Sequence, residues 1–187
     1  MSSKTSGGRK PVQSLMNGSR KSLKLNLGSG YTRKDEFISV DIDATCEPDI
    51  VDDIRTLSKI KSNSVKEIFT AHTLEHIYPK DLFRTLRCFY RVLKPNGFLK
   101  IIVPDVEDAC QQWIAKTITG KQFELIVLGS DPTATKYQTH HNIFYSSKLE
   151  RYLHVTGFVR IFTHLNYDNH ELIAEAYKPR RNNGFKG

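Results

Sequence analysis

The feature that most restricts the fold is a short alternating segment that runs directly into a glycine turn. Residues 23–27 (LKLNL) alternate apolar and polar side chains, and residues 28–30 (GSG) follow at once. Alternation with a period of two predicts a strand, and glycines in such a turn let the backbone pass close to a ligand. Residues 37–42 and 50–53 predict two further strands, each with an aspartate at its end. We expect these strand ends to meet at one edge of a sheet, where ligands of open α/β folds bind.

The middle of the chain continues with strand and helix signals. Residues 65–71 predict a fourth strand, and apolar residues recur at helical spacing over 81–93, with Asp81 as the expected N-cap. Residues 94–97 (KPNG) are expected to end this helix, and the nearly all-apolar residues 98–103 predict a buried parallel strand.

Two helical segments follow. Residues 105–128 have a helical pattern with a break at Gly120. Ser147 and Glu150 have the spacing of a capping box, which predicts a helix that ends at Gly157.

The last segments complete the predicted sheet. Residues 158–165 and 171–177 flank a polar turn and predict an antiparallel hairpin. Strands and helices alternate before this hairpin, and no internal repeat interrupts them. The pattern predicts one α/β domain over residues 23–178, with a mostly parallel seven-stranded sheet that a C-terminal antiparallel hairpin completes.

The basic residues are concentrated at the two ends of the chain. The net charge is +8, yet residues 25–177 hold 18 basic and 20 acidic side chains. Residues 1–22 and 179–187 are polar and poor in large apolar groups, which predicts disordered basic tails, and Lys178 is counted with the basic C-terminal end. Such tails can contact phosphates or anionic lipid, although a solvated tail is the commoner case. We therefore expect no contact with nucleic acid except through the tails.

Composition and cysteine spacing restrict the class of protein. Apolar residues make up 39% of the chain, which is ordinary for a globular domain, and the longest apolar runs are too short to span a bilayer. The first residues have no apolar stretch, so we expect no secretory signal. The three cysteines are far apart and lack a Cys-x-x-Cys pair, which argues against a disulfide framework or a zinc ribbon. The expected location is the cytoplasm.

Taken together, these segments resemble the class I S-adenosylmethionine-dependent methyltransferases, especially their small, type-11-like branch with a Leu-Asn-Leu-Gly-Ser-Gly turn. The resemblance covers about residues 23–106, with a weaker match over 140–158. It rests on LNLGSG (25–30), ISVDID (38–43), DIVDDIRTL (49–57), HTLEHI (72–77), RVLKPNGFLKIIVPD (91–105) and HHNIFYSSKLERYLHVTGF (140–158). It implies a Rossmann-like fold and S-adenosyl-L-methionine as the cofactor.

The resemblance also assigns residues at the strand ends to the cofactor site. They are Gly28, Ser29, Gly30, Asp41, Ile42, Asp53, Ile54, Ala71 and His72. The glycine turn would lie beneath the methionine part, together with Ala71 and His72. Asp41 would accept from the ribose hydroxyls, with Ile42 packed on the adenine, and Asp53 would accept from the adenine amino group near the Ile54 amide. The alternative is that both aspartates are ordinary strand-end or capping carboxylates.

Two departures from the family pattern concern the start of the domain. Asn26 stands where the family has an acid, and Thr32 stands at the third glycine position. Only residues 31–36 and 44–48 connect the first three strands, whereas a parallel crossover normally takes a dozen residues or more. We expect the first two crossover helices to be lost or reduced to single turns. One sheet face would then be thinly covered, which predicts a homodimer contact or a protein partner there.

The segment after the fourth strand allows other interpretations. Residues 72–76 (HTLEH) match the inverted zinc-protease pattern His-x-x-Glu-His, in which His72 and His76 bind zinc from one helical face. The motif directly follows a strand and Pro79 limits the helix, so this context disfavours a zinc hydrolase and we expect no metal. Glu75 and His76 could instead cap the next helix. A site for NAD is disfavoured too, because the third glycine of its fingerprint is missing.

The acceptor side is expected in a long polar loop over residues 129–145. It carries potential hydrogen-bonding and stacking groups: Lys136, Tyr137, His140, His141, Phe144 and Tyr145. Loops of this length in compact domains are commonly lids or binding loops, and this one should overhang the methyl group of the cofactor. The alternative is that its aromatic residues close the edge of the sheet.

The expected function is S-adenosylmethionine-dependent methyl transfer to a small-molecule or glycan acceptor. A hydroxyl acceptor benefits from a general base, and His76 and His140 are the catalytic candidates. The alternative is a non-catalytic subunit that binds the cofactor, for which Asn26 and the missing crossover helices argue. Asp41 is expected to be exposed, so that replacing it should weaken cofactor binding and leave stability nearly unchanged.

Overall fold

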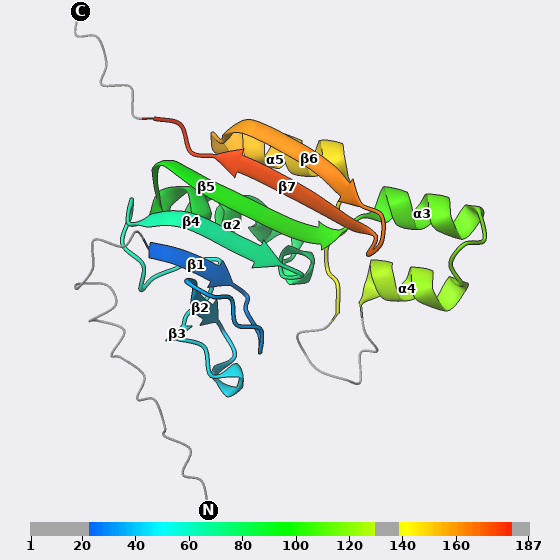
Figure 1. Cartoon of the computed structure of the whole chain (residues 1–187), viewed down its shortest axis with the longest axis horizontal. Coiled ribbons are helices and arrows are strands. Elements are labelled where there is room, and N and C mark those ends of the chain that lie inside the picture. Colours follow the sequence, from blue (N-terminus) through cyan, green and yellow to red (C-terminus); the bar gives the residue numbers. More distant parts are fainter. Residues whose placement is uncertain (1–22, 130–138, 181–187) are drawn as a thin grey trace, which may run out of the picture.

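The computed structural model describes residues 23–129 and 139–180 (Figure 1). The predicted N-terminal tail and most of the predicted C-terminal tail lie outside these residues. Lys136 and Tyr137 of the long loop lie outside them as well.

In the described part of the chain, a mixed sheet of seven strands forms the centre of the domain, in the order β3-β2-β1-β4-β5-β7-β6. Its strands are β1 (Leu23–Leu27), β2 (Ile38–Asp41), β3 (Ile50–Val51), β4 (Val65–Ala71), β5 (Leu93–Pro104), β6 (Val159–Asn166) and β7 (Glu171–Tyr177). The first five strands pair in parallel, and β7 runs antiparallel to both β5 and β6. The predicted fold class, Rossmann-like with a C-terminal hairpin, is confirmed.

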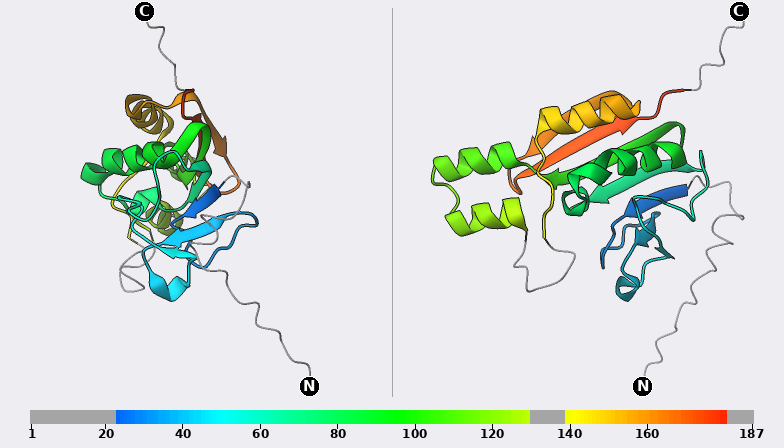
Figure 2. Two further views of the ribbon diagram at one scale, coloured as in Figure 1. Left: turned by 90° about the vertical axis from the view of Figure 1, so that its left-hand side faces the viewer. Right: turned by 180° about the vertical axis from the view of Figure 1, so that it is seen from behind.

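Within residues 23–129 and 139–180, four α-helices and two single-turn 3-10 helices connect the strands. They are η1 (Ala44–Cys46), η2 (Leu74–His76), α2 (Pro79–Val92), α3 (Val106–Ile114), α4 (Gly120–Leu128) and α5 (Ser146–Thr156). Helices α2 and α5 lie side by side on one face of the sheet (Figure 2). No helix within the described ranges is long and apolar enough to cross a membrane.

The core lies between this pair of helices and the sheet. Leu82, Leu86 and Phe89 recur at helical spacing on α2 and are fully buried, and Leu149 and Leu153 extend the apolar surface from α5. Each side chain of this size contributes roughly 1.5–3 kcal/mol when it leaves water completely. The apolar stripe of each helix therefore fixes which face of the sheet it covers.

The opposite face of the sheet carries no α-helix of the described residues (Figure 2). The connection from β1 to β2 is irregular, and η1 alone lies between β2 and β3, so the expected reduction of the first two crossovers is confirmed. Ion pairs across neighbouring strands lie on this face: Lys24 with Glu67 at 3.2 Å and Lys100 with Glu175 at 2.9 Å. A partner or a homodimer contact over this face stays a prediction.

The start of α2 differs from the prediction. Asp81 is not the N-cap: Tyr78 holds that position and Pro79 begins the helix. Proline suits the first helical position because its fixed φ is helical and the N–H that it lacks has no partner inside the helix. Asp81 lies in the first turn, where its negative charge still complements the helix dipole.

The predicted capping box of α5 is also wrong. The helix begins at Ser146 with Tyr145 as N-cap, and no side chain caps it. The Ser146 hydroxyl instead donates to Glu150 at 3.1 Å, one turn along the helix. The predicted end is confirmed, because Gly157 has a left-handed φ of 104° that favours glycine.

Two other boundaries shift by a few residues. Strand β5 begins at Leu93 rather than residue 98, since Leu93 pairs with Val65 before a register shift in which Asn96 adopts a φ of 60°. The break in the helical segment was predicted at Gly120 but lies before it. Thr119 caps α4, and Gly120 is the first residue of that helix.

Lys178 belongs to the core of the domain and not to a basic tail. It is buried, and its ammonium donates to the backbone oxygens of Tyr90 and Leu93 at 2.7 and 2.8 Å and to Oδ1 of Asn63 at 2.8 Å. These two backbone oxygens lie at the C-terminal end of α2, where a positive charge is stabilising. The grouping of Lys178 with the C-terminal basic residues was therefore wrong.

Candidate functional site

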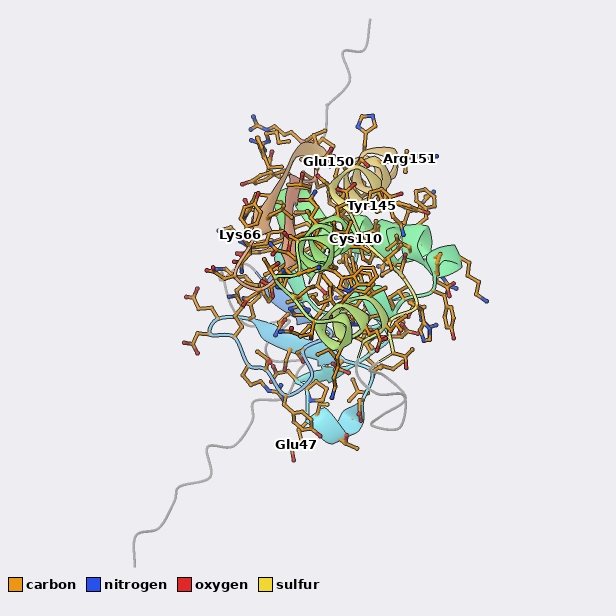
Figure 3. The ribbon with its side chains drawn as sticks, turned by 90° about the vertical axis from the view of Figure 1, so that its right-hand side faces the viewer. Glu47, Lys66, Cys110, Tyr145, Glu150 and Arg151 are labelled. Atoms are coloured by element: carbon orange, nitrogen blue, oxygen red, sulfur yellow. The ribbon has the colours of Figure 1, made fainter. Side chains whose placement is uncertain are left out.

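The predicted site residues come together at the carboxyl end of the parallel strands. The glycine turn follows β1, Asp41 ends β2, and His72 follows β4. Helices α3 and α4 project beyond the same end of the sheet (Figure 1). Figure 3 looks onto this end, with Cys110 of α3 near the middle of the view and Glu47, which follows η1, at its lower edge.

The glycine turn has backbone conformations that side chains rarely adopt. Gly28 and Gly30 have φ values of 64° and 48°. A Cβ added at Gly28 would lie 2.2 Å from Cγ2 of Thr73, whereas a Cβ at Gly30 would meet no atom within 4 Å. Gly28 is thus required for close packing against the segment after β4, and Gly30 borders open space.

Asp41 connects β2 to the glycine turn. Its carboxylate accepts from the backbone N–H of Gly30 at 2.7 Å and of Asp43 at 2.9 Å. Asp41 is only 9% exposed, so the expectation of an exposed strand-end carboxylate was wrong. The reason is that the turn closes over the end of β2. A carboxylate has about four lone-pair positions, so two remain for ligand hydroxyls.

The three residues that were predicted to contact the adenine have different surroundings in the structure. Ile42 is 47% exposed, as a packing surface for a flat ring requires, whereas the Ile54 side chain is buried in the core. Both oxygens of Asp53 accept from the Arg55 guanidinium, whose hydrogen bonds hold the pKa of the Asp53 carboxyl below its usual value. Asp53 therefore has a structural partner already, as in the alternative interpretation of this residue.

The two departures from the family pattern contact each other. The Asn26 side chain is buried, and its Nδ2 donates to the backbone oxygen of Thr32 at 3.4 Å. This hydrogen bond stabilises the irregular connection that replaces the first crossover helix. Its other side-chain atom, Oδ1, is an acceptor without negative charge.

His72 lies between two carboxylates. Its Nε2 is 2.8 Å from Oε1 of Glu171, and its Nδ1 is 3.4 Å from Oε1 of Glu75. Glu75 first and Glu171 second raise the pKa of His72 to about 9, although burial opposes them. His72 is therefore positively charged at neutral pH. Its backbone has a φ of 50°, a strained conformation that often marks functional positions.

The zinc-protease interpretation of residues 72–76 does not fit this geometry. That pattern needs His72 and His76 one turn apart on an α-helix, but the segment forms only the 3-10 turn η2. His72 instead turns to Glu171 on β7. The interpretation of Glu75 and His76 as caps of α2 is wrong as well, because Tyr78 is the N-cap.

The structure brings together the two predicted catalytic histidines. The rings of His76 and His140 are 5.0 Å apart between centroids. Each ring donates its Nδ1–H to a backbone oxygen, His76 to Thr139 at 3.0 Å and His140 to Ile126 at 3.1 Å. In the neutral form of each ring, the lone pair is then on Nε2. Burial lowers the pKa of His140, which favours the neutral ring.

These histidines line a cavity of about 320 Å³ at the end of the sheet. Its walls are formed by His72, Glu75, His76, Pro104, Leu125, Ile126, Gly129, His140, Asn169 and His170. Polar groups come from η2 and from the turn between β6 and β7, and apolar groups come from α4. A cavity of this kind, mostly apolar with a few convergent polar groups, is typical of small-molecule sites.

The described part of the long loop closes the edge of the sheet and also borders the cavity, while its role as a lid over the cofactor stays a prediction. Phe144 is buried and its backbone bridges Asp105, so this aromatic residue closes the edge of the sheet. His140 faces the cavity, and His141 stacks on Tyr78 with ring centroids 4.1 Å apart. The loop is thus anchored to the start of α2 by a ring contact.

Several residues of the site were not predicted. Thr73 packs against Gly28, and Glu171 holds His72. His170 donates from Nδ1 to Oδ2 of the buried Asp108 at 2.6 Å, which fixes one wall of the cavity. The polar turn before residue 171 was a visible signal, but the position of its side chains depends on the register of the β6–β7 hairpin.

Comparisons with known proteins agree with this architecture. Residues 30–101 match the family model described as a methyltransferase domain. No curated protein matches the sequence. Among solved structures, a SAM-dependent methyltransferase from Methanosarcina mazei is similar, with a TM-score of 0.62, 16% identity, and coverage of 92% of this chain and 99% of that one.

Two further solved structures have similar folds. One is a SAM-dependent methyltransferase from Archaeoglobus fulgidus, with a TM-score of 0.59, 17% identity, and coverage of 87% and 88% of the two chains. The other is a possible exported protein from Bordetella parapertussis, with a TM-score of 0.61 and 14% identity over 89% of this chain. The chain spans 65% of the length of the Bordetella protein. At these identities the likeness concerns the fold.

Proposed function

We propose that this chain, a member of the class I S-adenosylmethionine-dependent methyltransferase superfamily, transfers a methyl group to a small polar acceptor bound in the 320 Å³ cavity. One observation carries the proposal: the segment after β4 borders both the glycine turn and the cavity. Thr73 packs against Gly28, while His72 and His76 line the cavity. A methyl donor at the turn and an acceptor in the cavity would therefore be neighbours.

The residues at the strand ends suit S-adenosyl-L-methionine. Gly30 borders open space, Asp41 retains lone pairs for ribose hydroxyls, and Ile42 offers an exposed apolar surface for the adenine. Asp53 fits less well, because Arg55 occupies its carboxylate. Asn26 lacks the negative charge that would strengthen a hydrogen bond to the cofactor's ammonium group. We infer that Asp41 and the turn are the principal contacts.

The bound cofactor would supply a methyl group made electrophilic by a sulfonium centre. The chain's own contribution is then to position the acceptor, because an in-line displacement depends on holding the reacting atoms about 3–3.5 Å apart. The neutral His140 ring, with its Nδ1–H held by Ile126, presents an Nε2 that can accept the proton of a hydroxyl acceptor. His76 is placed to do the same.

The cavity restricts the acceptor by size. About 320 Å³ is near the lower limit of ligand sites, which run from roughly 300 to 1,000 Å³, and admits a group of the size of one sugar ring. The polar wall, with His72 charged, favours an acceptor with several oxygens. We therefore propose a hydroxyl of a small molecule or of a glycan as the acceptor.

Transfer from labelled cofactor to mixtures of monosaccharides, small phenols, small amines, RNA and protein tests this proposal. We expect label in hydroxyl compounds that fit the cavity, and no label with His140→Ala. Incorporation only into protein or RNA would contradict the assignment of the acceptor.

The alternative is a non-catalytic subunit that binds the cofactor, and the Asp53–Arg55 pair and Asn26 favour it. Calorimetry with S-adenosylmethionine and S-adenosylhomocysteine separates the two functions. Absence of binding would rule out the enzyme, and tight binding without turnover on any acceptor would favour the subunit. Cys46, Cys88 and Cys110 are free thiols, which is in keeping with work in a reducing compartment such as the cytoplasm.

A further inference from the structure

Glu75 is a buried carboxylate whose oxygens lack hydrogen-bond partners. Its side chain is 1% exposed, and neither Oε1 nor Oε2 has a hydrogen-bond partner among the residues that the structure describes. Among the described residues its ion-pair partner is His72, whose Nδ1 is 3.4 Å from Oε1. An ionised carboxylate in such a place is costly unless further positive charge or donors reach it. The position therefore calls for a ligand that none of the described residues provides.

Two imidazole nitrogens face the same place. The Nδ1–H groups of His76 and His140 are bound to the backbone oxygens of Thr139 and Ile126, so Nε2 carries the lone pair when each ring is neutral. This is the arrangement found around metals, where a ligating histidine donates its other N–H to a carbonyl or carboxylate that fixes its orientation. One donor atom from each of Glu75, His76 and His140 lies within 4.8 Å of the other two.

We propose that Glu75, His76 and His140 bind a divalent transition-metal cation, with Zn²⁺ as the reference ion. Two imidazoles and one carboxylate are a common ligand set for such ions, and they leave further coordination positions open. Ligands about 2.0–2.1 Å from a tetrahedral Zn²⁺ are about 3.3 Å apart, so the three donors would move together by up to about 1.5 Å on binding. His76 lies in a single 3-10 turn and His140 lies outside any helix or strand, so neither ligand is fixed by a long regular element.

The open coordination positions would face the cavity, since all three ligands line it. The metal site deepens the proposed function, and it depends on that proposal only in assuming that a methyl acceptor binds in the cavity. A cation there would bind the acceptor oxygen and lower the pKa of its hydroxyl. The lone pairs of His76 and His140 would then be used as ligands, so the acceptor hydroxyl, made more acidic by the cation, would lose its proton to water and not to a histidine.

A water molecule is the competing explanation for Glu75. Glu75 also borders a small cavity of about 10 Å³ together with Asn142, whose Nδ2 has no hydrogen-bond partner in the described part of the chain. That volume is at the lower limit for one water molecule, which could connect the carboxylate and the amide. Such a water would satisfy one oxygen of Glu75 and leave both histidine lone pairs unused.

Direct binding to the full, tag-free chain distinguishes these explanations. The protein is stripped with a chelator, and Zn²⁺ is titrated by calorimetry in competition with a chelator of known affinity. Co²⁺ provides a second measurement, because its visible absorption reports coordination by nitrogen and oxygen ligands. The variants are Glu75→Gln and His140→Ala, and the matched control is His154→Ala, which removes an exposed histidine of α5.

We expect one equivalent of Zn²⁺ for wild type and His154→Ala, with affinity at least tenfold lower in Glu75→Gln and His140→Ala. Weak binding at several sites, or variants that bind like wild type, would overturn the proposal. A Glu75→Gln protein that is more stable than wild type, with no site for Zn²⁺ in either, would favour the water. If Glu75→Gln does not fold, as judged by circular dichroism, His140→Ala decides.

Binding of S-adenosylhomocysteine to the same preparations separates this inference from the proposed function. A protein that binds S-adenosylhomocysteine but no Zn²⁺ contradicts the metal site alone. One that binds Zn²⁺ but neither S-adenosylhomocysteine nor S-adenosylmethionine supports the metal site and contradicts methyl transfer.

Discussion

The carboxylate of Asp41 accepts a hydrogen bond from the backbone N–H of Gly30 at 2.7 Å. One aspartate at the end of β2 thus fixes the turn at the end of β1, while part of its hydrogen-bonding capacity remains for a ligand. The side chain that supports the turn is therefore also the one that we propose to bind the ribose of the cofactor.

Asp41→Ala is expected to lower both cofactor affinity and stability. The loss of a charge-assisted pair of hydrogen bonds to ribose should weaken binding by tenfold or more, at about 1.5–3 kcal/mol for a hydrogen bond to a charged group. The unsatisfied N–H groups of Gly30 and Asp43 should reduce the free energy of unfolding by about 1–3 kcal/mol. Calorimetry with S-adenosylhomocysteine and urea unfolding measure the two effects.

Asp43→Ala is the matched control for this substitution. The Asp43 side chain caps η1 and does not touch the turn. The hydrogen bond from its backbone N–H to the Asp41 carboxylate is kept when the side chain is shortened to alanine. We expect its cofactor affinity to equal that of wild type. Weaker binding in Asp43→Ala than in Asp41→Ala would show that the ribose is bound elsewhere.

The two glycines of the turn should differ sharply in their tolerance of alanine. Both have positive φ, which costs an alanine about 1–2 kcal/mol. Gly28→Ala adds a severe overlap with Thr73, and Gly30→Ala adds none. Thermal unfolding should therefore show a much larger loss for Gly28→Ala. Thr73→Gly in the same chain should restore part of it, and equal effects of the two alanines would contradict this packing.

Lys178→Met should destabilise the domain by about 3 kcal/mol. The substitution removes a charged donor from the backbone oxygens at the end of α2 and leaves them buried. Arg180→Met, two residues along and exposed, should change the free energy of unfolding by no more than about 0.5 kcal/mol. Urea unfolding of the three proteins checks this, and similar values for the two variants would refute a structural role for Lys178.

His72 should make the metal-free protein less stable at alkaline pH. Its pKa, raised to about 9 chiefly by Glu75, is above the ordinary value of 6.5, so the folded state binds the proton more tightly. The contribution is complete below about pH 6.5 and disappears as the pH rises through 9. Asparagine tolerates the left-handed backbone, so His72→Asn is the comparison. Measured at pH 6, 7.5 and 9.5, the free energy of unfolding should fall more steeply with rising pH for wild type than for His72→Asn. Parallel curves for the two proteins would disprove the ion pair.

Local sequence patterns predicted most of the fold. The alternation over residues 23–27, the short connections and the apolar residues 98–103 each specify a strand or limit a crossover within a few residues of chain. Gly28 and Gly157 correctly predicted a turn and a helix end, because a backbone with positive φ leaves few alternatives to glycine. Helix starts were predicted less well. At α2 the signal was Pro79 at the first position and not the aspartate two residues on.

The candidate site could be predicted only in part, because several of its contacts join distant segments. The proximity of His76 and His140 was not specified by the sequence, although both had been named as candidates. Glu171 reaches His72 across 99 residues of chain, and its placement follows from the register of the hairpin. Lys178 had the sequence context of a tail, and only its packing beneath α2 reveals its role. No local pattern encodes such pairs.

The loss of the first two crossover helices has a consequence for the order of folding. Leu25 pairs with Ile38, 13 residues away, and Val40 pairs with Ile50 after only 10, whereas Pro104 and Glu171 pair across 67 residues. Each doubling of a closed loop adds about 0.6 kcal/mol of entropic cost, and contacts between nearby residues form fastest. The strands that carry the glycine turn and Asp41 are thus expected to assemble early in refolding, before the hairpin brings Glu171 to His72 and closes the cavity.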